Sequence, residues 1–280
     1  MSRAAHELVE IRGPSALGGG WRRAGDLLFL IAVAEFRRSY LGSALGYVWS
    51  FARPLLLFGV LLTVFTQAFD LGERVQHYPV LLLFNIVLFG FFQEATVLAV
   101  GSIVASESIV RRTQFPRLVI PLSVVLTALF NLGANLVVVF LFILVAGVDP
   151  TWTWLLLPVL VVALTVFTTA VAMLVSALNP RFRDTGIIWS VGVTALFYAT
   201  PVLYPLEIVP GTIGRLLALN PLAPLFELAR KWVIDPDAPG PVAAAGGVEW
   251  LLVPAAGYVG ICFLAVWVFR REAPRIAEAL

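Results

Sequence analysis

Charged residues are scarce in this chain. Asp, Glu, Lys and Arg make up 13% of its 280 residues, whereas hydrophobic residues make up 60%. Soluble domains carry about 25% charged and about 45–50% apolar residues. A water-soluble fold of this length has too much surface to hide so many apolar side chains. The composition therefore excludes an ordinary soluble domain and indicates an integral membrane protein.

Cysteine, histidine and lysine are nearly absent. One cysteine, Cys262, excludes a disulfide framework within the chain, and the distant His6 and His77 give no metal-ligand spacing. The only lysine, Lys231, is followed by Trp232, whereas a phosphate-binding P-loop needs Gly-Lys-Ser/Thr. We therefore expect no metal, no cofactor and no catalytic residue in this chain, and ATP and Mg²⁺ only in a partner subunit. The dispersed arginines, with a net charge of +2, do not indicate a nucleic-acid partner.

Long apolar runs dominate the rest of the chain. Six of them reach the roughly 20 residues that a helix needs to cross a bilayer: 48–69, 79–105, 118–148, 152–178, 185–204 and 249–269. We therefore expect an all-α membrane protein with six transmembrane helices. It divides into an N-terminal segment, a transmembrane domain and a tail, at residues 1–46, 47–271 and 272–280.

The basic residues are distributed unevenly between the two sides of this map. Fifteen of the 19 lie on the side of the N-terminus. Because Lys and Arg concentrate in cytoplasmic loops, both termini are expected in the cytoplasm. Ahead of the first span, the apolar run 27–34 is too short to cross and is flanked by charges. This run is therefore predicted to belong to a helix that lies on the membrane surface.

The connection between Tyr204 and Glu249 is long and rich in proline, yet its pieces 213–219 and 222–233 are apolar. A solvated loop would not be apolar, so we expect short helices that re-enter the outer leaflet, shielded by protein. Asp235-Pro236-Asp237 in this connection matches the Asp-x-Asp motif of metal-dependent glycosyltransferases. The surrounding proline and glycine favour a turn instead.

Glu94 is the only acid deep within a predicted span. Charge inside a membrane is costly and often functional. Two interpretations stay open: a hydrogen-bonded or protonated carboxyl at a subunit seam, or a group that faces a transported substrate. A single acid gives little support for a proton or sodium relay.

Aromatic residues supply a candidate lining for the passage of sugars. The six candidates lie in or beside the first and fifth predicted spans: Phe65, Phe69, Trp189, Phe197, Tyr198 and Tyr204. Flat apolar rings with polar edges suit the C–H faces of sugar rings. Helical spacing places Trp189 and Phe197 on one face and turns Tyr198 away from Trp189. The alternative is that these rings face lipid or pack between helices.

Five sequence blocks carry a resemblance to a known family. They are RRSYLGSALGYVWSFARP (37–54), RRTQFPRLVIPLS (111–123), NPRFRD (179–184), TPVLYP (200–205) and NPLAPLFELAR (220–230). In this order, on a map of six spans, the chain resembles the membrane subunits of type-2 ABC exporters for O-antigen, teichoic acid and cell-wall polysaccharide. The excess of arginine over lysine favours comparison with exporters of O-antigen or galactan-type glycans.

The resemblance implies a homodimer in the cytoplasmic membrane of a bacterium. Two ABC ATPase subunits would join it and drive a lipid-linked polysaccharide outward, with membrane lipids around the dimer. The inner loops would couple to the ATPase through Arg111, Arg112, Thr113, Gln114, Phe115, Arg181, Phe182, Arg183 and Asp184. The surface helix, over residues 21–43, would be an amphipathic interface helix with Arg37, Arg38 and Tyr40. The apolar pieces after Tyr204 would be gate helices at the outer mouth.

Two other classes of protein remain as alternatives. A membrane-embedded glycan polymerase or ligase usually has a long outer loop with clustered histidine, arginine or acidic residues, and the long outer connection here has no histidine. An ion-coupled flippase would have many spans and several intramembrane charges. The residues fit an exporter permease better than either alternative.

Overall fold

A computed structural model describes residues 20–41, 46–106, 117–209 and 211–279 of the chain. The long elements are α1 (Gly20–Leu41), α2 (Gly46–Gln67), α4 (Tyr78–Ala105), α6 (Val119–Val145), α7 (Leu157–Leu178), α8 (Thr185–Ala199) and α12 (Val248–Ala279). The short elements are α3 (Leu71–Arg74), η1 (Trp152–Leu156), η2 (Leu206–Ile208), α9 (Gly211–Ala218), α10 (Ala223–Val233) and α11 (Pro241–Ala245). No strand occurs in these ranges, which confirms the predicted all-α fold for the described residues.

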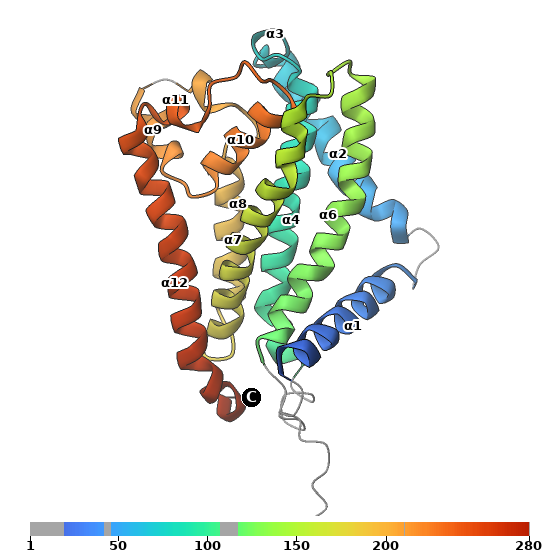
Figure 1. The fold of residues 1–280 in the computed structure, drawn as a ribbon, viewed down its shortest axis with the longest axis vertical. Helices are drawn as coiled ribbons and strands as arrows, with labels where there is room; N and C mark the ends of the chain where they lie inside the picture. The colour runs from blue at the N-terminus through green and yellow to red at the C-terminus, as the bar shows by residue number, and fades with distance from the viewer. Residues whose placement is uncertain (1–19, 42–45, 107–116, 210, 280) are drawn as a thin grey trace, which may run out of the picture.

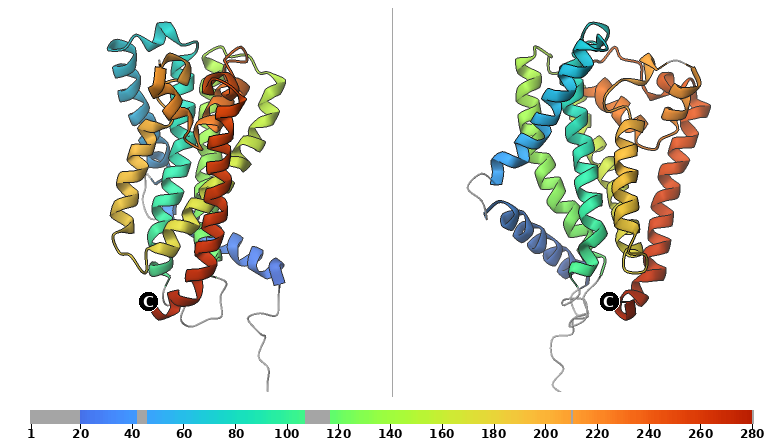
Figure 2. Two further views of the ribbon diagram at one scale, coloured as in Figure 1. Left: turned by 90° about the vertical axis from the view of Figure 1, so that its left-hand side faces the viewer. Right: turned by 180° about the vertical axis from the view of Figure 1, so that it is seen from behind.

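The bundle is built around α4, which contacts α2, α6, α7 and α8 (Figures 1 and 2). In the most apolar stretch of α4, 78% of the residues are buried, whereas none is buried in the corresponding stretch of α2. Both helices are apolar, so the difference in burial comes from where each helix lies in the bundle. The core is therefore α4, and α2 lies at the periphery, where lipid or another chain must cover its apolar side chains.

Among the described residues, five stretches are long and apolar enough to cross a membrane: α2, α4, α6, η1 with α7, and α12. The predicted fifth span, 185–204, is not among these five stretches because its helix is shorter than expected. Its helix α8 has 15 residues, a length of about 22 Å, whereas the hydrocarbon core is about 30 Å thick. The helix ends because Thr200 precedes Pro201, and a residue before proline is driven out of helical geometry. Thr200 is extended, with φ −98° and ψ 145°.

The backbone beyond α8 is irregular and buried, and three side chains satisfy it. Asn85 Nδ2 of α4 donates to the carbonyl oxygens of Pro201 (3.0 Å) and Val202 (3.3 Å). The Tyr78 hydroxyl donates to the Leu203 carbonyl at 2.9 Å. Asn220 Nδ2, further along the chain, donates to the Ala199 carbonyl at 3.3 Å and to Thr200 Oγ1 at 2.7 Å. Irregular backbone inside a membrane protein is tolerated where the protein supplies such partners.

The predicted surface helix is present as α1, which crosses the lower end of the bundle obliquely (Figure 1). It rests on α6: Ala32 is fully buried, and Phe29 and Phe36 make edge-to-face contacts with Phe130 at 6.2 and 5.8 Å. It is not among the stretches long and apolar enough to cross a membrane. Of its predicted interface residues, Arg37 and Arg38 are exposed, and the Tyr40 side chain lies outside the described side chains. Its contact with a partner stays a prediction.

The arginine-bearing segments gather at one end of the bundle. In Figure 1, α1, the connection between α7 and α8 and the C-terminal part of α12 lie at the lower end, and α3 and α9 to α11 lie at the upper end. This separation is the one that the distribution of basic residues predicts. Which end faces the cytoplasm stays a prediction.

The long connection before α12 is folded into η2, α9, α10 and α11, as its apolar pieces predicted. Their depth in the membrane stays a prediction. The segment Asp235–Asp237 is a turn: Asp235 Oδ1 accepts the backbone N–H of Asp237 at 3.2 Å, and its carbonyl accepts the N–H of Ala238 at 3.1 Å. The turn interpretation of Asp-x-Asp is therefore confirmed.

Candidate functional site

The connection between α7 and α8 presents charged and aromatic side chains at the lower end of the bundle. Arg181, Phe182, Arg183 and Asp184 are all exposed. Arg181 Nη1 lies 3.4 Å from Oε1 of Glu272 near the end of α12, and its guanidinium lies 5.3 Å from the centre of the Phe182 ring. This connection is therefore braced against α12 while its surface stays open to another protein.

The other predicted coupling residues, 111–115, lie outside the described residues. The helices on either side of them are described: α4 ends at Ala105, and α6 begins at Val119. Both of these helix ends lie at the lower end of the bundle in Figure 1. The role of Arg111 to Phe115 stays a prediction.

The aromatic candidates on α8 divide between two faces. Trp189 contacts Phe92 of α4, with ring centres 6.2 Å apart, and Phe197 contacts Phe89 of α4 at 5.2 Å. The spacing correctly placed these two rings on one face, and that face packs against α4. Tyr198 is 59% exposed. For Trp189 and Phe197, packing between helices is thus the observed arrangement within the chain.

The remaining aromatic candidates lie nearer the upper end. Phe65 of α2 and Phe69, just beyond the end of that helix, stack with ring centres 5.3 Å apart, and Phe69 is 54% exposed. Tyr204 is half-buried, and its hydroxyl donates to the Tyr198 carbonyl at 2.6 Å. Phe69 and Tyr198 are therefore the candidates most open to a passing molecule in the isolated chain.

Glu94 lies in a polar seam between α4 and α6. Asn131 Nδ2 donates to Glu94 Oε1 at 2.6 Å, and Asn135 Nδ2 donates to the Asn131 carbonyl at 2.9 Å. Arg53 of α2 is near enough to attract the carboxylate. This geometry favours the interpretation of Glu94 as a hydrogen-bonded carboxyl at a seam. The seam observed lies between two helices of one chain.

A cluster of charges at the upper end was not predicted from the sequence, although Asp235 belongs to the Asp-x-Asp turn considered above. Arg230 of α10 is 4% exposed, and its Nη2 lies 2.8 Å from Glu207 Oε1 and 3.4 Å from Asp235 Oδ2. Glu227, one helical turn before Arg230, accepts the backbone N–H of Leu206 at 2.9 Å. The sequence signal for this cluster is the spacing of Glu227 and Arg230, followed by Asp235. Residues three apart share a helix face, so this spacing indicates an acidic and a basic side chain close together.

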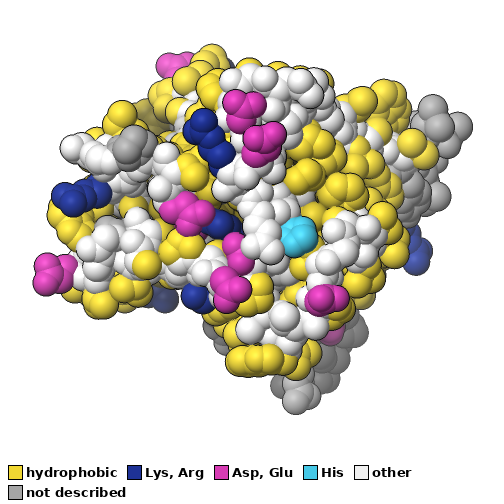
Figure 3. All heavy atoms as spheres, turned by 90° about the horizontal axis from the view of Figure 1, so that it is seen from above, with side chains coloured by type: hydrophobic (Ala, Val, Ile, Leu, Met, Phe, Trp, Pro, Cys, Tyr) yellow, Lys and Arg dark blue, Asp and Glu magenta, His cyan; other side chains and the backbone are white. Residues whose placement is uncertain are grey.

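Electrostatics within this charged cluster are dominated by burial. Burial raises the pKa of Glu227, as does the nearby Glu207, while the hydrogen bond from Leu206 and the charge of Arg230 act to lower it. The carboxylates converge on a guanidinium, and no group of three acidic, histidine or cysteine side chains suited to a metal ion occurs within the described ranges. Asp and Glu side chains are spread over this whole end, with Lys and Arg between them (Figure 3).

Comparison with known proteins identifies the family. Residues 26–233 match the family described as ABC-2 type transporter. The chain belongs to this family. Two bacterial proteins named as export permeases are similar along most of this ABC-2 chain. The O-antigen export system permease protein RfbA of Klebsiella pneumoniae is 32% identical over 204 residues, which is 72% of this chain and 77% of the relative. The protein of the same name from Myxococcus xanthus is 30% identical over 264 residues, 92% of this chain and 95% of the relative.

Membership confirms the resemblance drawn from the five sequence blocks. The region that matches the ABC-2 family begins within α1 and ends at Val233, the last residue of α10. It therefore includes the whole central bundle except α12, together with the exposed α7–α8 connection and Arg230. The chain is a multi-pass membrane protein of a transporter family.

Proposed function

We propose that this ABC-2 family chain is the membrane subunit of an ATP-driven exporter that moves a lipid-linked polysaccharide, of O-antigen or galactan type, across the cytoplasmic membrane of a bacterium. One observation carries the proposal: similarity to an O-antigen export permease extends over 92% of this chain and 95% of that relative. A similarity of that extent covers the bundle, the lower-end connections and the helices of the upper end together.

The energy source is proposed to be a pair of ABC ATPase subunits that bind ATP and Mg²⁺. The sequence supports this because its only lysine is not part of a P-loop. The docking surface would be the lower end, where Arg181, Phe182 and Arg183 are exposed. Residues 111–115 and α1 would complete it. Arginine beside an aromatic ring is a typical composition for a protein interface.

The path of the polymer is proposed to lie between two copies of the chain. Within one copy, the space around α4 is filled by packed rings, including Phe92 against both Phe167 and Trp189. A hydrophilic polymer cannot cross this core, nor dissolve in lipid. The exposed surfaces of α2 and α8 are the candidates for a shared wall, with Phe69 just beyond α2 and Tyr198 on α8. Glu94 lies off this path, in the seam between α4 and α6.

The test is reconstitution of the chain with its ATPase subunit in membrane vesicles supplied with lipid-linked glycan. We expect glycan to reach the far side only when ATP is hydrolysed, and an ATPase subunit without its catalytic glutamate is the control. Glycan elongation or ligation by this chain without the ATPase subunit would support a polymerase or ligase instead. Export that persists without ATP and stops when an ionophore collapses the ion gradient would support an ion-coupled flippase.

A further inference from the structure

The helix α10 is fixed firmly to the bundle at the upper end. The Trp154 indole Nε1 donates to the Val233 carbonyl at 3.0 Å, and the Thr153 hydroxyl donates to the Trp232 carbonyl at 2.6 Å. On its other side, Phe226 contacts Phe89 of α4, with ring centres 6.4 Å apart. These contacts hold α10 to η1 and to the central helix, so α10 is expected to stay in place when its neighbours move.

The preceding elements η2 and α9 form a separate unit, which we call the strap. They are joined closely: a Cβ atom at Gly214 of α9 would collide with the carbonyl oxygen of Val209, the residue after η2. The outer face of α9 is open, with Ile213 64% and Leu216 60% exposed. The inner face of the strap rests on Ala223 of α10 through Leu206 of η2 and Ala218 of α9. The strap therefore covers α10 without being embedded in the bundle.

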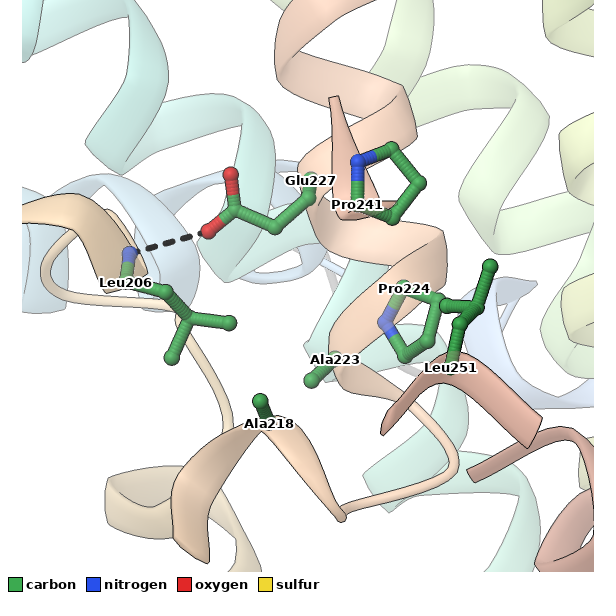
Figure 4. Close-up of a pocket in the computed structure, with 7 residues that line it drawn as sticks. All are labelled: Leu206, Ala218, Ala223, Pro224, Glu227, Pro241 and Leu251. Carbon is green, nitrogen blue, oxygen red and sulfur yellow. Dashed lines mark hydrogen bonds between the residues drawn. The ribbon is translucent and has the colours of Figure 1, made fainter. Parts of the chain in front are cut away.

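The seam between the strap and its support has few large apolar side chains. A narrow pocket lies along it, lined by Leu206 and Ala218 from the strap and by Ala223, Pro224, Glu227, Pro241 and Leu251 from α10 to α12 (Figure 4). Most of these side chains are small or are proline rings, and small side chains bury little apolar area. Polar contacts are therefore expected to contribute much of the attachment of the strap.

Two polar interactions join the strap to α10. The N–H of Leu206 donates to Glu227 Oε1 at 2.9 Å (Figure 4), and Glu207 Oε1 lies 2.8 Å from Arg230 Nη2. Asp235 contacts the same Nη2 at 3.4 Å and so helps to hold the guanidinium in position. Nε and Nη1 of Arg230 have no hydrogen-bond partner in the described part of the chain. A partly satisfied buried network is more easily exchanged for another arrangement than a fully satisfied one.

We propose that Arg230 is the catch of the strap: it holds η2 and α9 against α10 at rest and releases them when the upper end opens for the polymer. This role rests on the proposed function, and Arg230 acts in it as a positioning residue. Its charge attracts Glu207 of the strap while it also faces Glu227 and Asp235 on the fixed side. Without the guanidinium, these carboxylates repel one another across the seam, and the strap lifts.

The test measures access to the seam. Ala218 of the strap is 4% exposed, so a cysteine there is protected while the strap is down. Ala218→Cys is made in a Cys262→Ala background, and the chain with its ATPase subunit is treated in nanodiscs, without ATP, with a membrane-impermeant maleimide. Arg230→Gln and, separately, Glu207→Gln should raise the labelling rate about tenfold or more, as expected for loss of a charged hydrogen bond.

Two further variants separate a catch from a general loss of structure. Asp237→Asn removes a carboxylate from the same turn, where only the backbone N–H of Asp237 contacts Asp235, and it should label as slowly as the parent. Glu207→Arg combined with Arg230→Glu restores an opposite-charge pair and should slow labelling again. Thermal melting identifies any variant that fails to fold. If Arg230→Gln fails to fold, the test relies on Glu207→Gln, because the Glu207 side chain is a third exposed and its replacement disturbs the core less.

Labelling of Arg230→Gln and Glu207→Gln at the parent rate would overturn the catch. So would equally fast labelling of the Asp237→Asn control. Binding and hydrolysis of ATP should raise the labelling rate of the parent as well. A wild-type complex that fails to export glycan would instead overturn the proposed function, and the labelling measurements in the absence of ATP do not depend on that result.

Discussion

Asn85 in the first half of α4 donates a hydrogen bond of 3.0 Å to the carbonyl of Pro201, 116 residues further along the chain. The same amide reaches the Val202 carbonyl at 3.3 Å. Both carbonyls lie beyond the end of α8, so this side chain supplies the donor that buried backbone carbonyls require outside a helix. The irregular segment that leads from α8 to the strap is therefore held against α4 at this contact.

Replacement of Asn85 should therefore destabilise the protein. Asn85→Leu keeps the size of the side chain and leaves two buried carbonyls without their donor, at a cost of about 1–3 kcal/mol. We expect a lower thermal denaturation temperature in detergent. Ser190→Ala is the control, because Ser190 is exposed on α8 and bonds only within its own helix, to the Ile187 carbonyl. An equal effect of the two substitutions would show that the hydrogen bonds from Asn85 to the backbone beyond α8 do not stabilise the protein.

Neighbouring residues of α8 should separate packing from transport. Phe197→Ala removes a ring packed against Phe89, and loss of a packed aromatic ring costs about 3–5 kcal/mol. Its main effect should be lower thermal stability and yield. Tyr198→Ala removes an exposed ring and should leave stability unchanged while glycan export falls. Normal export by a normally expressed Tyr198→Ala variant would remove this ring from the proposed wall.

Charge reversal at the lower end should weaken coupling to the ATPase subunit. Arg181→Glu with Arg183→Glu places negative charge on the exposed connection and next to Glu272. Like charges across an interface cost several kcal/mol, so we expect about a tenfold or greater loss of copurified ATPase and of stimulated hydrolysis. Arg111→Glu with Arg112→Glu should act in the same way. The control is Arg74→Glu, at an exposed position of α3 at the opposite end. Undiminished copurification in both double variants would place the docking surface elsewhere.

Glu227 should make stability depend on pH. Burial raises its pKa in the folded protein, so folding favours the protonated carboxyl. The stabilisation is complete below the ordinary glutamate pKa, about 4.3, and is lost as the pH rises through the raised value. Glu227→Gln keeps an oxygen for the Leu206 N–H and cannot ionise. The parent should lose stability relative to this variant as pH increases from about 4.3, and parallel melting curves across pH would contradict the raised pKa.

The position of α1 can be tested by its chemical accessibility. Gly25 is exposed, with no atom within 4 Å of a Cβ built there, and Glu73 is exposed at the opposite end of the bundle. In a Cys262→Ala background, Gly25→Cys should react only with reagents on the cytoplasmic side and Glu73→Cys only with reagents outside. Reaction of Gly25→Cys from outside would reverse the proposed orientation.

The sequence alone determined much of this architecture. Apolar runs of more than 20 residues predict crossing helices in any context, because a membrane must cover them. That α1 is not a crossing helix followed from an apolar run too short to cross, and the turn at Asp235 followed from local proline and carboxylate chemistry. Each of these features depends on residues that are close together in the chain.

Only the tertiary structure decided which faces are buried. Spacing placed Trp189 and Phe197 on one face, but a membrane helix is apolar toward lipid and toward its neighbours alike, so periodicity could not show that this face packs on α4. The burial of the irregular backbone beyond α8 depends on Asn85, and the burial of Arg230 depends on Glu207. Such contacts join residues that are distant in sequence, and their partners are brought together only when the helices pack.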